Sequence, residues 1–436
     1  MDNALMVGLI LVFGMFGLMA MGVSVSVSIG LPAAVCAVLL MGGERGVLTS
    51  AQKIYGGVDS FPLLAIPFFV LAGTIMNKGG IAARLIDFAK TATGRMPGAL
   101  AQTNVLANML FGSISGSALA GASAVGSIMS PAMEKDGYDM RFAAANNIAS
   151  APAGMLIPPS NTIIVYALVS QASVGALFLA GYIPGILWGV ACMIIVWLYS
   201  RKRPKLRGEG FPPFKVGFTM FLRALPSLLL IVIVIGGIIA GWFTPTEGAA
   251  IAVVYATLLS LAYRTITPRD FPKILLDATR TSSVVVFLIA LSTIMSYVMT
   301  FSGIPRQLGM WLVSVTDSKA VFLLIMMVML LIIGIPLDAT PAVLIFTPIF
   351  LPIATQYYGI HPVHFGIMMV FNMCIAVISP PSAPVLFVGA RVAGLKVEDV
   401  IKPLMPFFLS LIAMLLVIQF VPELSLWLPR AAGLIR

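Results

Sequence analysis

Charged side chains are scarce in this sequence, at 10% of its 436 residues, whereas 60% of the residues are hydrophobic. The mean hydropathy is +1.05, and apolar runs of about 20 residues are typical of membrane-spanning helices. No polar interval is long enough for a sizeable soluble domain. Only Asp2 is charged before the first apolar run begins at Ala4. A secretory signal would need a basic start, so we expect no cleaved leader.

The residues on which most enzymes and metal sites depend are also few. There are two histidines and three cysteines. Cys36, Cys192 and Cys374 lie in apolar runs without paired spacing, so buried free thiols are predicted. The sequence has no phosphate-binding loop, Ser/His/acid set or metal-ligand spacing, and we expect no enzyme and no ATP hydrolysis. The net charge of +10 comes from basic residues scattered over loop ends, which indicates membrane topology and not nucleic-acid binding.

The apolar segments predict an all-α integral membrane protein of about ten transmembrane helices and two re-entrant hairpins. In the first half, residues 1–207, we expect spans 4–22, 24–41, 61–77 and 175–200, an amphipathic surface helix 81–93, a hairpin 97–133 and a broken helix 140–168. In the second half, residues 208–436, we expect spans 219–241, 247–263, 282–300 and 402–421, a surface arm 303–316, a hairpin 319–356 and a broken helix 362–391. Each arm of the first hairpin is expected to be about 15 residues, short of the roughly 30 Å hydrocarbon core.

The two halves resemble each other at a constant spacing of 222 positions. The matching residues are Gly112, Gly137 and Pro158-Pro159-Ser160 in the first half, and Gly334, Gly359 and Pro380-Pro381-Ser382 in the second. Such an ordered set predicts an internal repeat. Five spans per half would bring the second half into the membrane from the other side, so we expect inverted repeats. Placing the basic stretch 201–207 in the cytoplasm puts 20 of the 26 Lys and Arg residues inside.

The paired prolines interrupt two apolar helices in corresponding places. Two adjacent prolines remove backbone donors and stop a helix, and freed backbone groups are costly in hydrocarbon unless they line a cavity. Unwound carbonyls together with hydroxyl, amide or carboxylate oxygens suit a hard cation such as sodium. The candidate ligands for two or more sodium sites are Ser113, Ser115, Ser117, Ser160, Asn161, Asp338, Thr340, Ser379 and Ser382. The alternative for the serines is close packing of membrane helices.

Substrate contacts are predicted at the same breaks, where half-helix N-termini carry partial positive charge for an anionic group. The candidates are Pro158, Pro159, Asn147, Asn372, Pro380 and Pro381. Interhelical hydrogen bonds are the alternative for Asn147 and Asn372, as for the other asparagines within apolar helices.

Four segments resemble motifs of the large membrane subunit of tripartite ATP-independent periplasmic (TRAP) transporters. They are Gly112-Ser-Ile-Ser-Gly-Ser-Ala, Ile157-Pro-Pro-Ser-Asn, Phe243-Thr-Pro-Thr-Glu and Ser379-Pro-Pro-Ser. The resemblance implies an elevator-type carrier of the bacterial inner membrane, similar in fold to the ion transporter superfamily. It implies sodium-coupled import of a small organic acid, such as a sialic acid, a dicarboxylate or another sugar acid.

The resemblance also implies two partners, a small four-helix membrane subunit and a periplasmic substrate-binding protein. We expect the small subunit to be a separate chain. Two alternatives stay open. One is a stand-alone sodium/carboxylate symporter or ion exchanger, and the other is a channel or structural membrane subunit, which the paired helix breaks disfavour.

Overall fold

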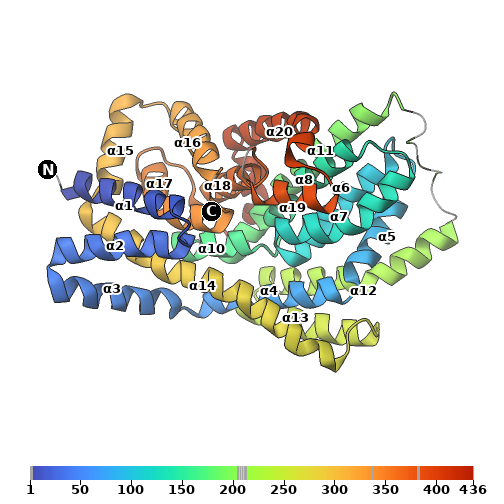
Figure 1. Cartoon of the computed structure of the whole chain (residues 1–436), viewed down its shortest axis with the longest axis horizontal. Helices are drawn as coiled ribbons and strands as arrows, with labels where there is room; N and C mark the ends of the chain where they lie inside the picture. The colour runs from blue at the N-terminus through green and yellow to red at the C-terminus, as the bar shows by residue number, and fades with distance from the viewer. Residues whose placement is uncertain are drawn as a thin grey trace.

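The computed structural model describes residues 3–203, 206, 208, 210, 214–335, 337–380 and 383–435. Its regular elements are helices, and no β-strand occurs within these ranges (Figure 1). The fold class predicted from the apolar runs, an all-helical membrane protein, is confirmed.

The helices of the first half follow the predicted segments closely, with one addition. In chain order they are α1 (Asn3–Ala20), α2 (Val25–Met41), α3 (Gly43–Val58), the short 3-10 helix η1 (Phe61–Leu64), α4 (Ala65–Lys78), α5 (Ile81–Thr93), α6 (Ala99–Ser115), α7 (Ala118–Lys135), α8 (Met140–Ser150), α9 (Ala153–Leu156), α10 (Asn161–Ser170) and α11 (Val174–Ser200). The addition is α3, where the sequence suggested only a polar connection.

The second half repeats this order of elements. It contains α12 (Phe214–Ile239), α13 (Pro245–Ala262), η3 (Pro268–Asp270), α14 (Phe271–Ser302), α15 (Ile304–Val315), α16 (Lys319–Gly334), α17 (Ala339–Gln356), α18 (Pro362–Ala376), α19 (Pro384–Val392), α20 (Val397–Phe420) and α21 (Glu423–Ala431). The single 32-residue helix α14 occupies the position that α3 and α4 share in the first half. The last helix, α21, was not predicted.

Seven of the described helices are long and apolar enough to cross a membrane, or eight if α8–α10 is one span bent by 42° at its break. Four shorter apolar helices, Ala4–Ala20, Val25–Met41, Lys319–Gly334 and Pro362–Ala376, fall below that length. This bend lies at the break that the paired prolines predict. The count of about ten spans stays a prediction.

The hairpin arms are longer than expected. In the first hairpin α6 has 17 residues and α7 has 18, because α7 continues into the charged pair Glu134–Lys135. In the second hairpin, α17 has 18 residues, so this one arm is long and apolar enough to cross a membrane by itself. The arms of the first hairpin are thus two to three residues longer than the expected length of about 15, and the re-entrant path stays a prediction.

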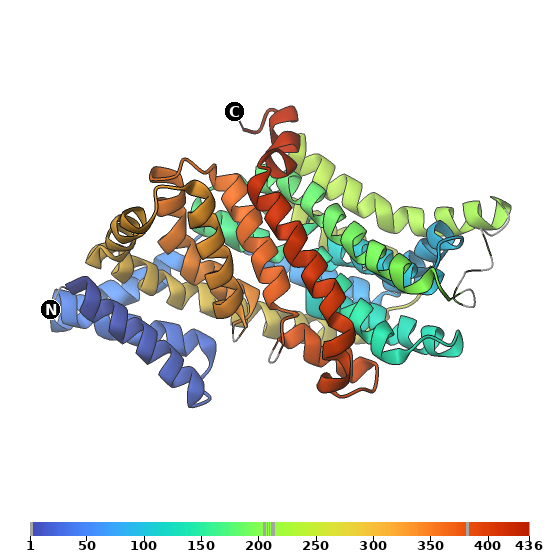
Figure 2. The ribbon, with the colours of Figure 1, turned by 90° about the horizontal axis from the view of Figure 1, so that it is seen from above.

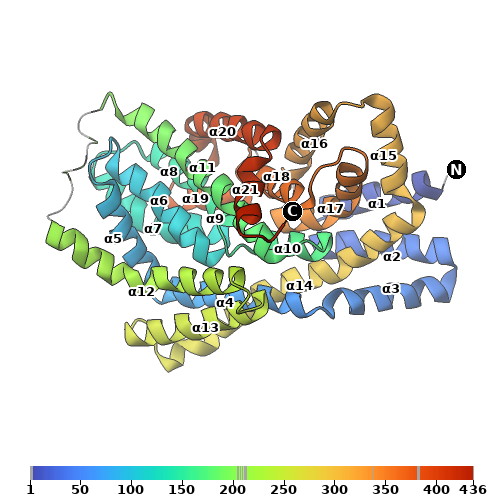
Figure 3. The same ribbon diagram turned by 180° about the vertical axis from the view of Figure 1, so that it is seen from behind.

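The helices form two layers, visible one below the other in Figures 1 and 3. The lower layer is built on contacts of α14 with α2, α3 and α4 and of α4 with α13. The upper layer holds both hairpins, both broken helices, α11 and α20. Figure 2 shows α20 crossing the top of this layer, where it packs on α8, α11 and α18. We call the two layers the framework and the hairpin layer.

Within the hairpin layer, helices of one half pack against helices of the other. Helix α10 of the first half packs on α17 of the second, and α19 of the second packs on α7 of the first. Equivalent close contacts also recur. A Cβ on Gly112 would lie 2.3 Å from Cα of Gly154, and a Cβ on Gly334 would lie 2.5 Å from Cβ of Ala376, 222 positions later in each case. Each hairpin is thus pressed against its own broken helix at the same place, as two equivalent repeats would require.

Candidate functional site

A cavity of about 510 Å³ lies where the hairpin layer meets the framework. Six segments from both halves line it: α4, the tip between α6 and α7, the break before α10, α14, the tip before α17, and the second break. The sequence predicted chemistry at the two tips and the two breaks. The structure brings all four to one cavity.

The first tip reaches the cavity because it is locked against the first break. Gly116 has φ +60°, a conformation that favours glycine, and a Cβ there would lie 3.0 Å from the carbonyl oxygen of Pro159. Ser115 and Ser117 on either side line the cavity. The Ser115 hydroxyl is buried and has no hydrogen-bond partner among the described residues, whereas Ser117 Oγ accepts a hydrogen bond from Ala120 N at 3.4 Å.

The first break contributes Asn161, the first residue of α10. Its side chain lines the cavity, and its Oδ1 is buried without a hydrogen-bond partner in the described part of the chain. Ser160, just before it, has a different role. Ser160 Oγ accepts from Ile163 N at 3.3 Å and donates to the carbonyl oxygen of Met155, so it caps α10 and closes the break. Ser160 is fully buried and does not line the cavity.

The second tip contributes Asp338 and Thr340, and both line the cavity. Asp338 Oδ1 accepts a hydrogen bond from Ala339 N at 2.9 Å, at the N-terminus of α17. The carboxylate is exposed, because it faces the cavity, and it joins no ion pair within the described ranges. It therefore gives this end of the cavity a negative charge.

The remaining predicted cation ligands lie outside the cavity lining. Ser113 Oγ donates to Leu110 O at 2.8 Å, and Ser379 Oγ donates to Ile375 O at 2.9 Å, both within their own helical turns. Ser382 falls outside the described residues. Of the prolines, Pro158 and Pro159 are buried at the first break and Pro380 is half-buried at the second, while Pro381 also falls outside the described residues.

The two predicted substrate asparagines are buried away from the cavity lining. Asn147 Nδ2 donates to Ala122 O at 2.8 Å, and its Oδ1 accepts from Asn108 Nδ2 at 3.0 Å. Asn372 Nδ2 donates to Met368 O at 3.4 Å, and its Oδ1 has no partner among the described residues. The interhelical hydrogen bonds given as the alternative account for Asn147.

The cavity also has a wall that sequence reasoning missed. Lys78 at the end of α4 and Asp277 on α14 face it and form an ion pair of 2.6 Å, beside Asn77 and Thr281. Lys78 and Asp277 are 199 positions apart, so no local pattern joins them. In the sequence each looks like an ordinary charge at a helix end.

The chemistry of this lining suits a cation and an anion together. Hydroxyl, amide and carboxylate oxygens come from Ser115, Asn161, Asp338 and Thr340, a set that hard cations prefer. Helices α10 and α17 both begin at the cavity, and their N-termini carry partial positive charge toward an anion. In the part of the chain that is described, no group of three or more His, Cys, Asp or Glu side chains could hold a metal ion.

The similarities to known proteins agree with this architecture. The chain is 48% identical over 431 residues to protein YgiK of Salmonella typhimurium, which covers 98% of this chain and 99% of that one. It is 38% identical over 408 residues to the C4-dicarboxylate TRAP transporter large permease protein DctM of Pseudomonas aeruginosa (93% and 95%). It is 36% identical over 426 residues to the sialic acid TRAP transporter large permease protein SiaM of Vibrio cholerae (96% and 97%).

The fold is shared with a more distant protein. The crystal structure of the Alcanivorax borkumensis YdaH transporter superposes with a TM-score of 0.67 at 15% identity, over 90% of each chain. Residues 12–424 match the family profile described as "Tripartite ATP-independent periplasmic transporter, DctM component". The chain therefore belongs to the TRAP transporter family, as its large permease component.

Proposed function

We propose that this large permease imports a small organic acid together with sodium. The observation that carries the proposal is the single cavity in which both tips and both breaks meet. The oxygens of Ser115 and Asn161 are buried there without partners in the described part of the chain. Buried polar groups normally have partners, so an unpaired set facing one cavity supports a ligand that completes it.

We assign one sodium site to each half. The first would use Ser115, Ser117 and Asn161, with backbone carbonyls of the tip and the break. The second would use Asp338 and Thr340; Ser379, whose hydroxyl is bonded within its own turn, and Ser382, outside the described residues, are not assigned to it. The carboxylate of Asp338 offsets the cation's charge. This supports tighter sodium binding in the second half than in the first, which offers only neutral oxygens.

The substrate is proposed to be an organic anion of the kind named for the relatives, a C4-dicarboxylate or a sialic acid. Its carboxylate would bind at the N-termini of α10 and α17. Among the described residues of the cavity lining, Lys78 is the cationic side chain, and its ion pair with Asp277 fixes its position. Binding of sodium first would add positive charge to the same space and so favour the anion.

Transport is proposed to follow an elevator mechanism, in which the hairpin layer moves against the framework. The two-layer arrangement supports this division, because the tips and breaks all belong to one layer. The framework contributes α4 and α14 to the opposite wall of the cavity. The cavity reaches Lys78 and Asp277, which the predicted orientation places at the cytoplasmic end, so the described state would be open inward.

Reconstitution tests the proposal. The chain would be purified with its small membrane subunit, placed in proteoliposomes, and supplied with a cognate periplasmic binding protein loaded with radiolabelled organic acid. We expect uptake with an inward sodium gradient and none when potassium replaces sodium. Equal uptake in potassium would rule out sodium coupling, and full uptake by the chain alone would favour the stand-alone carrier.

A further inference from the structure

A second cavity, of about 640 Å³, lies on the framework where α5, α12 and the end of α13 meet. Its lining includes two arginines from different halves of the chain, Arg84 on α5 and Arg223 on α12, together with Tyr263 and Thr265. None of these residues lines the cavity described above. The cavity thus collects two guanidinium groups at a place that the transport proposal does not use.

The first guanidinium is held in position. Arg84 Cζ lies 3.5 Å from the centre of the Tyr263 ring, and Arg84 Nη1 donates to the carbonyl oxygen of Gly80 at 3.2 Å. Stacking on an aromatic face leaves most of the in-plane N–H donors of an arginine free. The Tyr263 hydroxyl is itself buried and without a hydrogen-bond partner within the described ranges. Arg84 is therefore pre-positioned with unused donors.

The second guanidinium has no protein partner among the described residues. Across the described residues, Arg223 makes no ion pair, and no hydrogen bond engages its side chain. Its side chain is exposed at the cavity. Two arginines at one cavity repel each other, and an anion between them would relieve that repulsion and accept bidentate hydrogen bonds.

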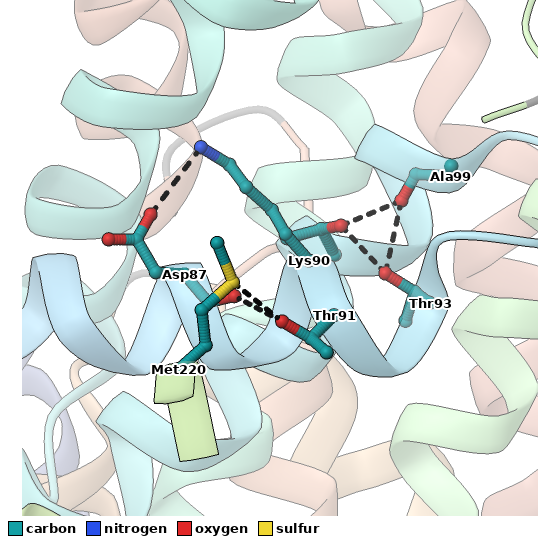
Figure 4. A network of polar contacts seen from close by, with 7 residues as sticks. Asp87, Lys90, Thr91, Thr93, Ala99 and Met220 are labelled. Atoms are coloured by element: carbon teal, nitrogen blue, oxygen red, sulfur yellow. Dashed lines mark hydrogen bonds and ion pairs between the residues drawn. The ribbon is translucent and has the colours of Figure 1, made fainter. Parts of the chain in front are cut away.

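The one acidic residue of the lining, Asp87, does not neutralise this pair. Asp87 Oδ1 lies 3.7 Å from Lys90 Nζ one turn further along α5, as Figure 4 shows. In the same view Thr91 bonds to the sulfur of Met220, a contact that joins α5 to α12 beside the cavity. With Asp87 paired to Lys90, the two arginines leave a net positive charge in the cavity.

The surface next to this charge is apolar and belongs to a membrane span. Helix α12 is long and apolar enough over Lys215–Ile239 to cross a membrane. Phe221 and Leu222, beside Arg223, are 38% and 47% exposed, and Phe218 is 51% exposed one turn earlier. A free phosphate would make no contact with these apolar side chains. A phospholipid would place its phosphate between the arginines and its acyl chains along α12.

We propose that this cavity binds the headgroup of an anionic phospholipid in the cytoplasmic leaflet. The predicted orientation places α5, the start of α12 and the end of α13 on that side, where basic pockets between helices recognise acidic lipids. The headgroup would join α5 to α12. Because α5 leads directly into the first hairpin, the lipid would brace the point where the framework passes into the hairpin layer.

Native mass spectrometry of the purified full chain tests the site. Phosphatidylglycerol and phosphatidylcholine with identical acyl chains would be titrated against the wild type. We expect bound phosphatidylglycerol to exceed phosphatidylcholine clearly. Replacing both arginines, Arg84→Gln with Arg223→Gln, should lower phosphatidylglycerol affinity by about twenty-fivefold, from about fivefold for each basic residue near a membrane surface.

Two further variants guard against a loss that reflects poor folding. Asp87→Asn removes the only negative charge of the lining and frees Lys90, so it should bind phosphatidylglycerol more tightly than the wild type. Lys396→Gln removes an exposed lysine on the same predicted face, away from the cavity, and should change nothing. Equal binding of the two lipids, or loss of preference in Lys396→Gln, would overturn the proposal. Displacement of the lipid by excess inorganic phosphate would instead identify a free-anion site and would also overturn it.

Discussion

The two hairpins have the same helix arrangement, but the first contacts its broken helix through buried polar side chains and the second mainly through apolar ones. In the first, Asn108 Nδ2 lies 2.8 Å from Ser150 Oγ, 3.0 Å from Asn147 Oδ1 and 3.2 Å from Asn104 Oδ1, so amides and a hydroxyl join α6 to α8. The residues 222 positions later are Met326 for Asn104, Leu330 for Asn108, Met369 for Asn147 and Asn372 for Ser150. All eight side chains are buried.

This difference shows that the same backbone arrangement can be held by two kinds of contact. Within a membrane, helices associate through close packing and interhelical hydrogen bonds, and either can supply the required stability. Both halves retain the close approach of hairpin to broken helix, at Gly112 with Gly154 and at Gly334 with Ala376. We infer that this approach, which sets where the tip meets the break, matters more to the site than the polarity of the hairpin interior.

The largest effect is expected from placing a first-half residue in the second half. Leu330→Asn would remove a fully buried apolar side chain, and Asn372, at the position equivalent to Ser150, is the polar group that the repeat places beside the new amide. The lost packing alone should cost about 2–5 kcal/mol. The measurement is the midpoint of thermal unfolding in detergent. A wild-type midpoint would show that the apolar interior of the second hairpin is not needed.

A smaller effect is expected at the shared backbone contact. Gly112→Ala would place a Cβ 2.3 Å from the backbone of Gly154, so the hairpin must move away from the break. Overpacking of this kind costs about 1–3 kcal/mol. We also expect uptake to fall more than stability does, because the tip would be displaced.

The matched control for this contact is Gly137→Ala. Gly137 has φ +76° but no atom within 4 Å of an added Cβ, so it tests backbone strain without a clash. That strain costs about 1–2 kcal/mol, and uptake per folded molecule should be unchanged. If Gly112→Ala and Gly137→Ala had equal effects on uptake, the approach of hairpin to break would not be setting the site.

The smallest effect is expected from the reverse exchange, Asn108→Leu. This variant removes the hydrogen bonds of Asn108 Nδ2 but introduces the side chain that the second half already uses. Interhelical hydrogen bonds in membranes contribute about 0.6–2 kcal/mol, and the added apolar contacts offset part of that. We predict a lower unfolding midpoint than wild type but a higher one than Leu330→Asn. A larger loss than Leu330→Asn would mean that the polar network is essential to the fold.

Much of this architecture could be predicted from the sequence. Long apolar runs, Pro-Pro breaks and the 222-residue spacing each leave a local pattern, and most of the predicted spans overlap a described helix, although α14 begins at Phe271, eleven residues before the predicted span 282–300. The amphipathic helix α3 was missed because its apolar side chains are interrupted by Glu44, Arg45 and Lys53. Its role became visible only through packing on α2 and α14.

The cavity lining was harder to predict, since it depends on which atoms other contacts already use. Ser160 and Asn161 are neighbours of similar chemistry, yet Ser160 caps α10 and Asn161 keeps an unpaired oxygen facing the cavity. Lys78 and Asp277 meet only because α4 and α14 cross in the framework. Neither the different roles of Ser160 and Asn161 nor the pairing of Lys78 with Asp277 can be predicted from a local sequence pattern.

The most direct test of the account measures the sodium dependence of uptake for one variant of each half. Asn161→Ala removes the unpaired oxygen of the first break. Asp338→Asn removes the charge of the second tip, and because Asn is as good a cap as Asp it leaves α17 capped. Each should weaken apparent sodium affinity by about ten- to a hundredfold, while Lys396→Ala should behave as wild type. Wild-type sodium dependence in both variants, at normal expression, would show that the tips and breaks serve packing and do not bind the ion.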